Sequence, residues 1–232
     1  ISIGMGKAGS WMMRVGIWLL WLLCMPAWAQ GWHLQAGEEG ILLWSRAHPP
    51  GTFLALRLEM NVAAPPSALL AVLRDTARHQ EWLPQSLEVR VLAKPAPDED
   101  LVYTRLSAPW PVQERELITH SRLQRLPNCA LVLTVWAAPD ALPPYPGRVR
   151  IRTSEGRWEA VPQLNGTTLI RLETYTNPGD NLPGWLINPI AAQAALDSFR
   201  AIRRLMEAIQ PEPCPCARMR QGRQVGPCGS HP

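Results

Sequence analysis

The sequence predicts an α+β domain in which a curved antiparallel sheet holds a long C-terminal helix. Two observations lead to this prediction. Between residues 86 and 176, apolar and polar residues alternate in runs separated by turn clusters, as in consecutive antiparallel strands. Between residues 189 and 209, apolar residues recur at helical spacing. A sheet and an amphipathic helix bury their apolar faces when the sheet curls around the helix.

Residues 1–29 are expected to be a signal peptide with a few residues upstream. An apolar run, Val15–Met25, follows Arg14 and precedes the small residues Ala27 and Ala29, which predicts cleavage after Ala29. A retained membrane anchor is the alternative, but the run is shorter than the roughly 18 residues that such an anchor needs. The sequence therefore predicts a periplasmic or secreted protein.

Composition limits the remaining chain to one nearly neutral domain. The chain has 23 basic and 19 acidic side chains, and Lys7 and Arg14 of the basic ones fall in the signal peptide. Nucleic-acid binding needs a clustered basic face, so we expect no nucleic-acid partner. Residues 30–210 are predicted to form a single domain, expected to be a monomer. Residues 211–232 are rich in Pro, Gly, Cys and Arg, and are predicted to be a disordered tail.

The first part of this domain is predicted to be a hairpin followed by a helix. Ile41–Ala47 and Phe53–Ala63 alternate as strands on either side of the turn His48–Gly51. Trp32–Glu39 is expected to be a short lead-in. Pro65 and Pro66 then open a helix with an apolar stripe, because proline suits a first turn whose backbone donors have no partner.

The central part is predicted to be a strand meander. The expected strands are Leu87–Ala93, Leu101–Ala108, Gln113–Gln124, Ala130–Ala137, Val149–Thr153 continuing past Gly156 to Val161, and Thr167–Thr176. Asn165–Gly166 is a typical two-residue hairpin turn. The proline-rich segment Pro139–Gly147 is expected to be a mobile, lid-like loop.

The last helix is predicted to begin at Asn188, with asparagine as the N-cap and Pro189 at the first helical position. Its apolar face is expected to hold Ala191, Ala195, Phe199, Ile202, Met206 and Ile209.

A proline-flanked corner lies between two of the predicted strands. Pro109–Pro111, followed by Gln113–Leu117 (QEREL), resembles the PWP-x-x-R-[DE] signature of the START family, the lipid-transfer domains related to steroidogenic acute regulatory protein. The segments that recur in the family's order are Gly40–Ile41, Trp44–Arg46, Asp75, Glu81–Pro84, Pro143–Pro146, Val149–Arg150, Trp158, Asn177–Gly179 and Leu182–Asn188. The resemblance covers about Trp32–Ile209.

This resemblance implies the helix-grip fold, with a ligand tunnel between the sheet and the C-terminal helix. It implies a lipid or sterol-like ligand, transient contact with a membrane surface, and no cofactor. Whether the ligand is transferred or only bound stays open. The residues expected to bind the ligand are Trp110, Arg115, Leu117, Thr119, Trp136, Tyr175, Phe199 and Ile202.

Arg115 is expected to be the polar group of the tunnel. Strand alternation places it on the same face as Leu117 and Thr119. A buried guanidinium must be paired, so Arg115 contacts either a lipid head group or a protein carboxylate such as Glu173.

No catalytic or metal-binding constellation is evident. The sequence contains no nucleophile elbow, no HExxH motif, no P-loop and no dinucleotide-binding turn. Glu114 and Glu116 share a strand face, which we interpret as charges flanking an edge strand. After the signal peptide four cysteines remain, Cys129, Cys214, Cys216 and Cys228, and sequence alone does not choose their pairing.

Two other function classes remain open. Relatives of the wider superfamily include cyclases and aromatases, and a cyclase here would use Arg115, Thr119, Glu173 and Tyr175 in the same tunnel. An interaction module with a filled core is the third hypothesis. A cavity large enough for an acyl chain would argue against that module.

Overall fold

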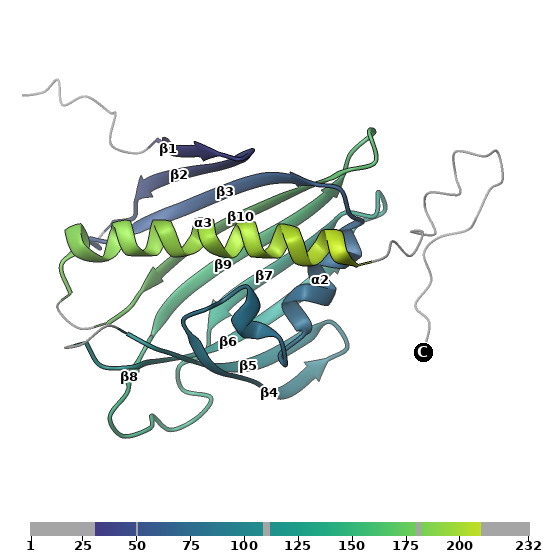
Figure 1. Cartoon of the computed structure of the whole chain (residues 1–232). Coiled ribbons are helices and arrows are strands. Elements are labelled where there is room, and N and C mark those ends of the chain that lie inside the picture. The colour runs from purple at the N-terminus through teal and green to yellow at the C-terminus, as the bar shows by residue number, and fades with distance from the viewer. Residues whose placement is uncertain (1–30, 50, 109–111, 180–181, 210–232) are drawn as a thin grey trace, which may run out of the picture. The chain divides into compact units, whose positions relative to one another are not determined.

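The computed structural model describes residues 31–49, 51–108, 112–179 and 182–209 (Figure 1). The chain divides into two compact units, Ile1–Gly31 and Trp32–Pro232, and the account below concerns the second. The expected signal peptide, the corner with Trp110 and the expected tail lie outside the described residues. None of the described helices has the length and apolarity that a membrane crossing requires.

The described chain forms a ten-stranded sheet with two α-helices and a short 3-10 turn. The strands are β1 (His33–Glu38), β2 (Ile41–Ala47), β3 (Leu54–Val62), β4 (Ser86–Ala96), β5 (Glu99–Leu106), β6 (Arg115–Arg125), β7 (Leu131–Ala137), β8 (Val149–Arg150), β9 (Thr153–Pro162) and β10 (Thr168–Asn177). The helices are α2 (Pro66–Arg74) and α3 (Gly184–Ala208), and η2 (His79–Glu81) is the 3-10 turn.

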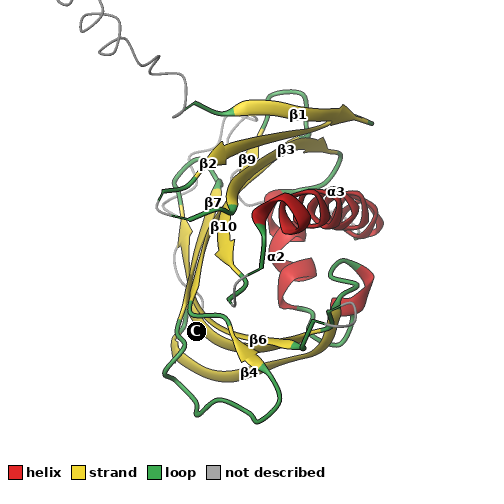
Figure 2. Ribbon diagram, turned by 90° about the vertical axis from the view of Figure 1, so that its left-hand side faces the viewer, coloured by secondary structure: helices red, strands yellow, loops and turns green. Residues whose placement is uncertain are grey.

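The strand order is β1-β2-β3-β10-β9-β7-β6-β5-β4, and the pairs along it are antiparallel. Among the described strands, the short β8 departs from this path, because it pairs with β6 in parallel. The sheet curves around α3 and α2, which lie on its inner face (Figure 2). We call the opposite face the outer face. The predicted α+β helix-grip fold, a curved antiparallel sheet around the C-terminal helix, is confirmed. The structure adds that the last strand of the meander, β10, pairs with β3 of the N-terminal hairpin.

Local sequence explains most of the element bounds. β2 begins and ends at Ile41 and Ala47, as alternation predicts. Pro66 opens α2 at a position where its missing donor costs nothing. Gly166 takes a φ of 85° in the β9–β10 turn, a conformation that glycine adopts without a steric cost. The expected lead-in before Ile41 is instead a strand, β1, which pairs with β2 at the sheet edge.

The predicted start of the last helix is wrong by about one helical turn. α3 begins at Gly184, so Pro189 lies inside the helix and Asn188 is not its N-cap. The Asn188 amide instead reaches the beginning of β3. Its Oδ1 accepts a hydrogen bond from Leu54 N at 3.1 Å, and its Nδ2 donates to Thr52 O at 3.2 Å. The asparagine therefore attaches α3 to the sheet.

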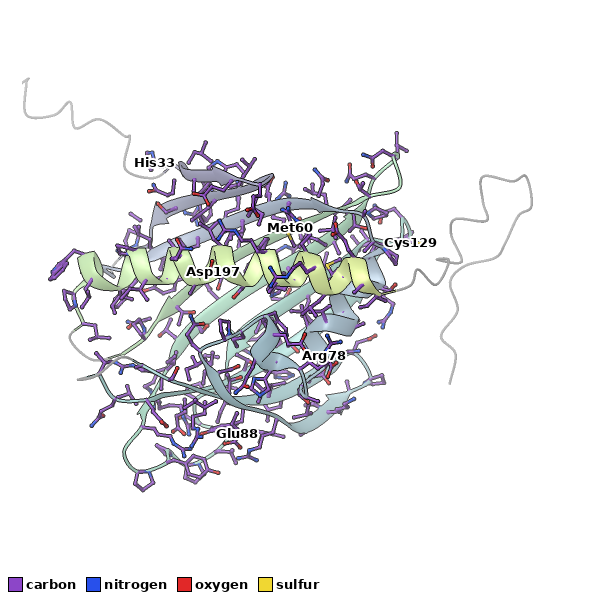
Figure 3. The ribbon with its side chains drawn as sticks, in the orientation of Figure 1. His33, Met60, Arg78, Glu88, Cys129 and Asp197 are labelled. Atoms are coloured by element: carbon purple, nitrogen blue, oxygen red, sulfur yellow. The ribbon has the colours of Figure 1, made fainter. Side chains whose placement is uncertain are left out.

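The main core lies between α3, α2 and the strands β2, β3, β9 and β10. Leu58 and Met60 (Figure 3) of β3 pack with Ile170 of β10 beneath the helix. Phe199 of α3 stacks on Trp158 of β9, with ring centroids 5.6 Å apart. The inner face of this half of the sheet is therefore filled.

Cys129, labelled in Figure 3, lies in the turn between β6 and β7 and is disulfide-bonded. Each of the other four cysteines of the chain lies outside the described residues.

Candidate functional site

An inner cavity of about 230 Å³ lies under the α2–η2 segment, where the other half of the sheet curves away from α3. Its lining residues are Leu73, Arg74, Thr76, Trp82, Leu83, Val89, Val91, Lys94, Asp100, Val102, Thr104, Thr119, Ser121, Leu133, Val135 and Trp158. The strands contribute alternate residues, so β5 sends Asp100, Val102 and Thr104 inward. Most of this wall is apolar.

The polar part of the cavity centres on an ion pair between α2 and β5. Arg74 Nε lies 3.1 Å from Asp100 Oδ2, and Nη2 lies 2.9 Å from the same oxygen. Asp100 is buried, whereas the Arg74 side chain is 37% exposed. The Ser121 hydroxyl donates to the backbone oxygen of Asp100 at 3.4 Å. A ligand with a polar end would find both charge signs and hydroxyl groups here.

Trp82 closes the cavity from the side of η2. It lines the inner cavity and also a smaller hollow of about 180 Å³ between α2 and α3. Its buried indole Nε1 has no hydrogen-bond partner among the described residues. A buried donor without an acceptor is costly, so this N–H is a candidate contact for an acceptor group of a ligand.

The residues expected to bind the ligand do not share one site. Thr119 lines the inner cavity, and Leu117 and Arg115 precede it on the same face of β6. Trp136 and Tyr175 line a separate hollow on the outer face. Phe199 and Ile202 are buried in the core beneath α3, and Trp110 lies outside the described residues.

Arg115 is buried, and its Nη1 donates to the backbone oxygen of Gln113. Glu173, the carboxylate proposed for it, pairs instead with Arg57 on the outer face, 2.6 Å from Nη2. The set expected for a cyclase is therefore divided between the two faces of the sheet.

The lining of the inner cavity differs from the expected tunnel. None of its lining residues comes from α3, because the packing of Phe199 on Trp158 fills the space beneath that helix. The sequence signal that could have located it is the inward alternation of β4 and β5, where Val89, Val91 and Val102 lie on one face.

The loop 138–148 does not cover the inner cavity. It packs on the outer face, where Arg150 Nη1 donates to Leu142 O at 2.8 Å and Nη2 donates to Pro143 O at 3.1 Å. The Tyr145 backbone N–H donates to Glu116 Oε1 at 3.0 Å. Fully buried Glu116 also pairs with Arg150, so the loop expected to be a lid is anchored to buried groups of the outer face.

The interpretation of Glu116 as an edge-strand charge is wrong. β6 lies inside the sheet, between β5 and β7. Tyr103 donates its hydroxyl to Glu116 Oε2 at 3.1 Å. Burial, and then this hydrogen bond, raise the pKa of Tyr103, so the phenol stays neutral. Glu116, Arg150 and Tyr103 therefore form a structural network beneath the loop 138–148.

Fold and cavity together define a helix-grip domain with a small, mostly apolar, partly open cavity that has a polar end. The START domain family model matches residues 27–211, so the chain belongs to the START domain family. The family assignment implies a hydrophobic small molecule as the ligand.

Similar proteins of known structure have the same fold. A STAR-related lipid transfer protein from Xanthomonas axonopodis is 28% identical, with a TM-score of 0.70 over 76% of this chain and 99% of that structure. The human StAR-related lipid transfer protein 5 is 13% identical, with a TM-score of 0.68 over 84% of this chain and 94% of that structure. In sequence, the chain is also similar to an uncharacterized protein of Pseudomonas aeruginosa, with 24% identity over 77% of this chain and 88% of that protein.

Proposed function

We propose that this START domain binds a single-chain amphiphile in its inner cavity and carries it between membranes outside the cytoplasm. The observation that carries the proposal is the cavity itself, with apolar walls from β4, β5 and β7 and the Arg74–Asp100 pair on one side. The Xanthomonas protein, which covers nearly the same length, is described as a lipid transfer protein, and this supports the same role here.

The size of the cavity favours one chain over two. At about 230 Å³ it is smaller than the roughly 300–1,000 Å³ of typical small-molecule sites. Each methylene that the cavity takes out of water contributes about 0.8 kcal/mol. A bilayer offers nearly the same gain, so the protein exchanges its ligand with membranes instead of retaining it.

An exposed apolar surface at the beginning of α3 supports docking to a membrane. Trp185 is 78% exposed, Ile190 is 48% exposed and Leu186 is 40% exposed. We call these three residues the apolar tip. Exposed tryptophan beside aliphatic residues is typical of helices that lie in the headgroup region of a bilayer. The apolar tip lies at the beginning of α3, directly after the segment 177–183 in the chain. A membrane that binds the tip would therefore contact this end of α3.

Export is part of the proposal. The N-terminal pattern predicts cleavage after Ala29, and Cys129 is disulfide-bonded. Disulfides persist in oxidising compartments such as the periplasm, so the bonded cysteine supports a location outside the cytoplasm.

The test uses delipidated protein with a fluorescent fatty acid, a fluorescent lysophospholipid and a fluorescent two-chain phospholipid. Each is presented in vesicles, and its uptake by the protein and its delivery to acceptor vesicles are measured separately. We expect uptake of the single-chain probes and faster delivery with protein than without it. Uptake of none of the three would reject lipid binding, and uptake without faster delivery would reject transfer.

A further inference from the structure

The outer face of the sheet carries a second hollow, of about 270 Å³, which the proposed lipid site does not use. We call it the outer groove, and its lining residues are Trp32, Arg46, His48, Ala55, Thr134, Val135, Trp136, Glu155, Gly156, Arg157, Glu173, Thr174 and Tyr175. Of these, only Val135 also lines the inner cavity. The sheet separates the two sites, so the outer groove can hold a different ligand.

Aromatic side chains flank a carboxylate across the centre of this groove. Trp136 of β7 pairs with Glu155 of β9, and Glu155 pairs with Tyr175 of β10. Neighbouring strands lie about 4.8 Å apart, so the strand positions of the two aromatic residues are separated by roughly 10 Å. The Glu155 side chain between them is 64% exposed. This width suits one non-planar ring in contact with an aromatic face.

Each of these two aromatic rings is supported on one side. His48 stacks on Tyr175, with centroids 3.7 Å apart and an interplanar angle of 20°. His120 lies against Trp136, with centroids 4.5 Å apart. Tyr175 is buried in a cluster with Phe53 and Ala55, whereas Trp136 is half-buried, so Trp136 is the ring that a ligand can contact. A ring held in this way loses little further freedom when a ligand binds.

A third ring, Trp32, belongs to the opposite side of the groove. It lies between two guanidinium groups, with the Arg46 carbon 4.5 Å and the Arg57 carbon 4.4 Å from its ring centroid. Arg57 is also ion-paired with Glu173. Trp32 is thus fixed in orientation although it lies at the beginning of the described domain.

The lining of the outer groove carries equal numbers of positive and negative side chains. The lining residues include two guanidinium groups, Arg46 and Arg157, and two carboxylates, Glu155 and Glu173. Arg157 also pairs with Glu159 at 2.9 Å, and Glu155 lies 3.9 Å from the imidazole of His48. An anion would meet the carboxylates, and a bare cation would meet the guanidinium groups. An alkyl chain would bury these charges without hydrogen bonds, which is costly.

A ligand rich in hydroxyl groups can form hydrogen bonds with both the carboxylates and the guanidinium groups of this lining. A hydroxyl donates to a carboxylate and accepts from a guanidinium at the same time. The C–H bonds of a sugar ring carry small positive charges, and these are attracted to the negative face of an indole. We propose that the outer groove binds a neutral sugar unit of a glycan, held by Trp136 and Glu155. The groove is open to solvent, so the rest of such a glycan can extend beyond it.

The test titrates the full chain with soluble chitotetraose and cellotetraose, followed by tryptophan fluorescence and saturation-transfer NMR. We expect saturable binding of at least one sugar at micromolar to millimolar concentration. Trp136→Ala and Glu155→Gln are each expected to weaken it at least tenfold. Leu164→Ala and Glu88→Gln are the controls, because Leu164 is an exposed apolar residue in the β9–β10 turn and Glu88 is a half-exposed carboxylate on β4.

Each outcome decides the proposal. Sugar binding that is lost in both groove variants and kept in both controls supports it. The proposal is overturned if neither sugar binds saturably, or if Trp136→Ala binds the sugar as tightly as the parent protein does. Thermal melting of each variant shows whether it is folded, and Glu155→Gln is expected to melt like the parent because the side chain is exposed. Lipid uptake by the same samples reports on the inner cavity, so failure at one site is distinguishable from failure at the other.

Discussion

Glu116 Oε1 and Arg150 Nη2 lie 2.8 Å apart, with both side chains almost completely buried under the loop 138–148. The pair joins β6 to β8 and holds the loop through three backbone oxygens, those of Pro139, Leu142 and Pro143. Such a pair is costly to break, because the remaining charge stays buried.

We expect Glu116→Gln to destabilise the protein by about 3–5 kcal/mol, since it leaves Arg150 charged and unmatched. Replacing both residues, Glu116→Leu with Arg150→Met, is expected to recover only part of this loss, because Tyr103 and the Tyr145 N–H then lack an acceptor. Chemical denaturation measures both free energies of unfolding. A cost below about 1 kcal/mol for Glu116→Gln, as for a surface pair, would contradict the buried pair.

The Arg74–Asp100 pair predicts how the inner cavity selects ligands. Asp100→Asn releases the guanidinium for a ligand, so it is expected to tighten binding of a fatty acid about tenfold while leaving the matching fatty alcohol unchanged. Arg74→Met is expected to weaken fatty-acid binding by a similar factor. Asp100→Asn leaves a half-exposed arginine and is expected to melt near the parent. Arg74→Met leaves the buried Asp100 carboxylate without its cation, so it is expected to melt below the parent. Equal changes for acid and alcohol would show that the pair does not contact the head group.

The contact of Asn188 with the beginning of β3 predicts an unusual response to aspartate. At a helix N-cap, aspartate replaces asparagine without loss. Here an aspartate side chain would lack the donor to Thr52 O, so Asn188→Asp is expected to cost about 1–2 kcal/mol of unfolding free energy. Asn188→Ala is expected to cost more, because Leu54 N then loses its acceptor as well. An aspartate variant as stable as the parent would favour the N-cap that the sequence predicts.

The apolar tip predicts membrane binding without a change in stability. Trp185→Ser is expected to lower binding to phosphatidylcholine vesicles about tenfold, because the indole no longer leaves water. The control is Leu164→Ser, since Leu164 is 87% exposed in the β9–β10 turn. Co-sedimentation with vesicles measures the difference. Equal binding by the two variants would exclude the apolar tip as the docking surface.

The hydrogen-bonded carboxylate of Glu99 is expected to account for part of the loss of folding stability at low pH. Its hydrogen bond from Arg122, followed by that from His120, holds the pKa of the Glu99 carboxyl below its usual value. The carboxylate therefore contributes stability above the unfolded-state pKa of about 4.3, and this contribution is lost as pH falls through the lower folded-state pKa. Glu99→Gln is expected to make the free energy of unfolding fall less steeply as the pH is lowered. A stability profile of Glu99→Gln parallel to that of the parent below about pH 5 would contradict the role.

Much of the fold follows from local pattern, and the site does so only in part. Alternation locates β2 and places Thr119 on the inner face, because the period of a strand is a backbone property. It does not distinguish inside from outside, so the sequence assigns Trp136 and Tyr175 to the tunnel although they lie in the outer groove. Asn188 shows a second limit, since its partners Thr52 and Leu54 are 136 and 134 positions away in sequence.

The junction of β3 with β10 has a consequence for synthesis. Arg171 of β10 pairs with Glu59 of β3, and the two residues are 112 positions apart in the sequence. At about 5–20 residues per second, the ribosome needs roughly 6 to 22 seconds between them. During that time β3, with Leu58 and Met60 on its apolar face, has β2 beside it but lacks both β10 and the covering helix α3. The nascent chain thus stays incompletely folded until its last third emerges, a state that a translocation channel can thread.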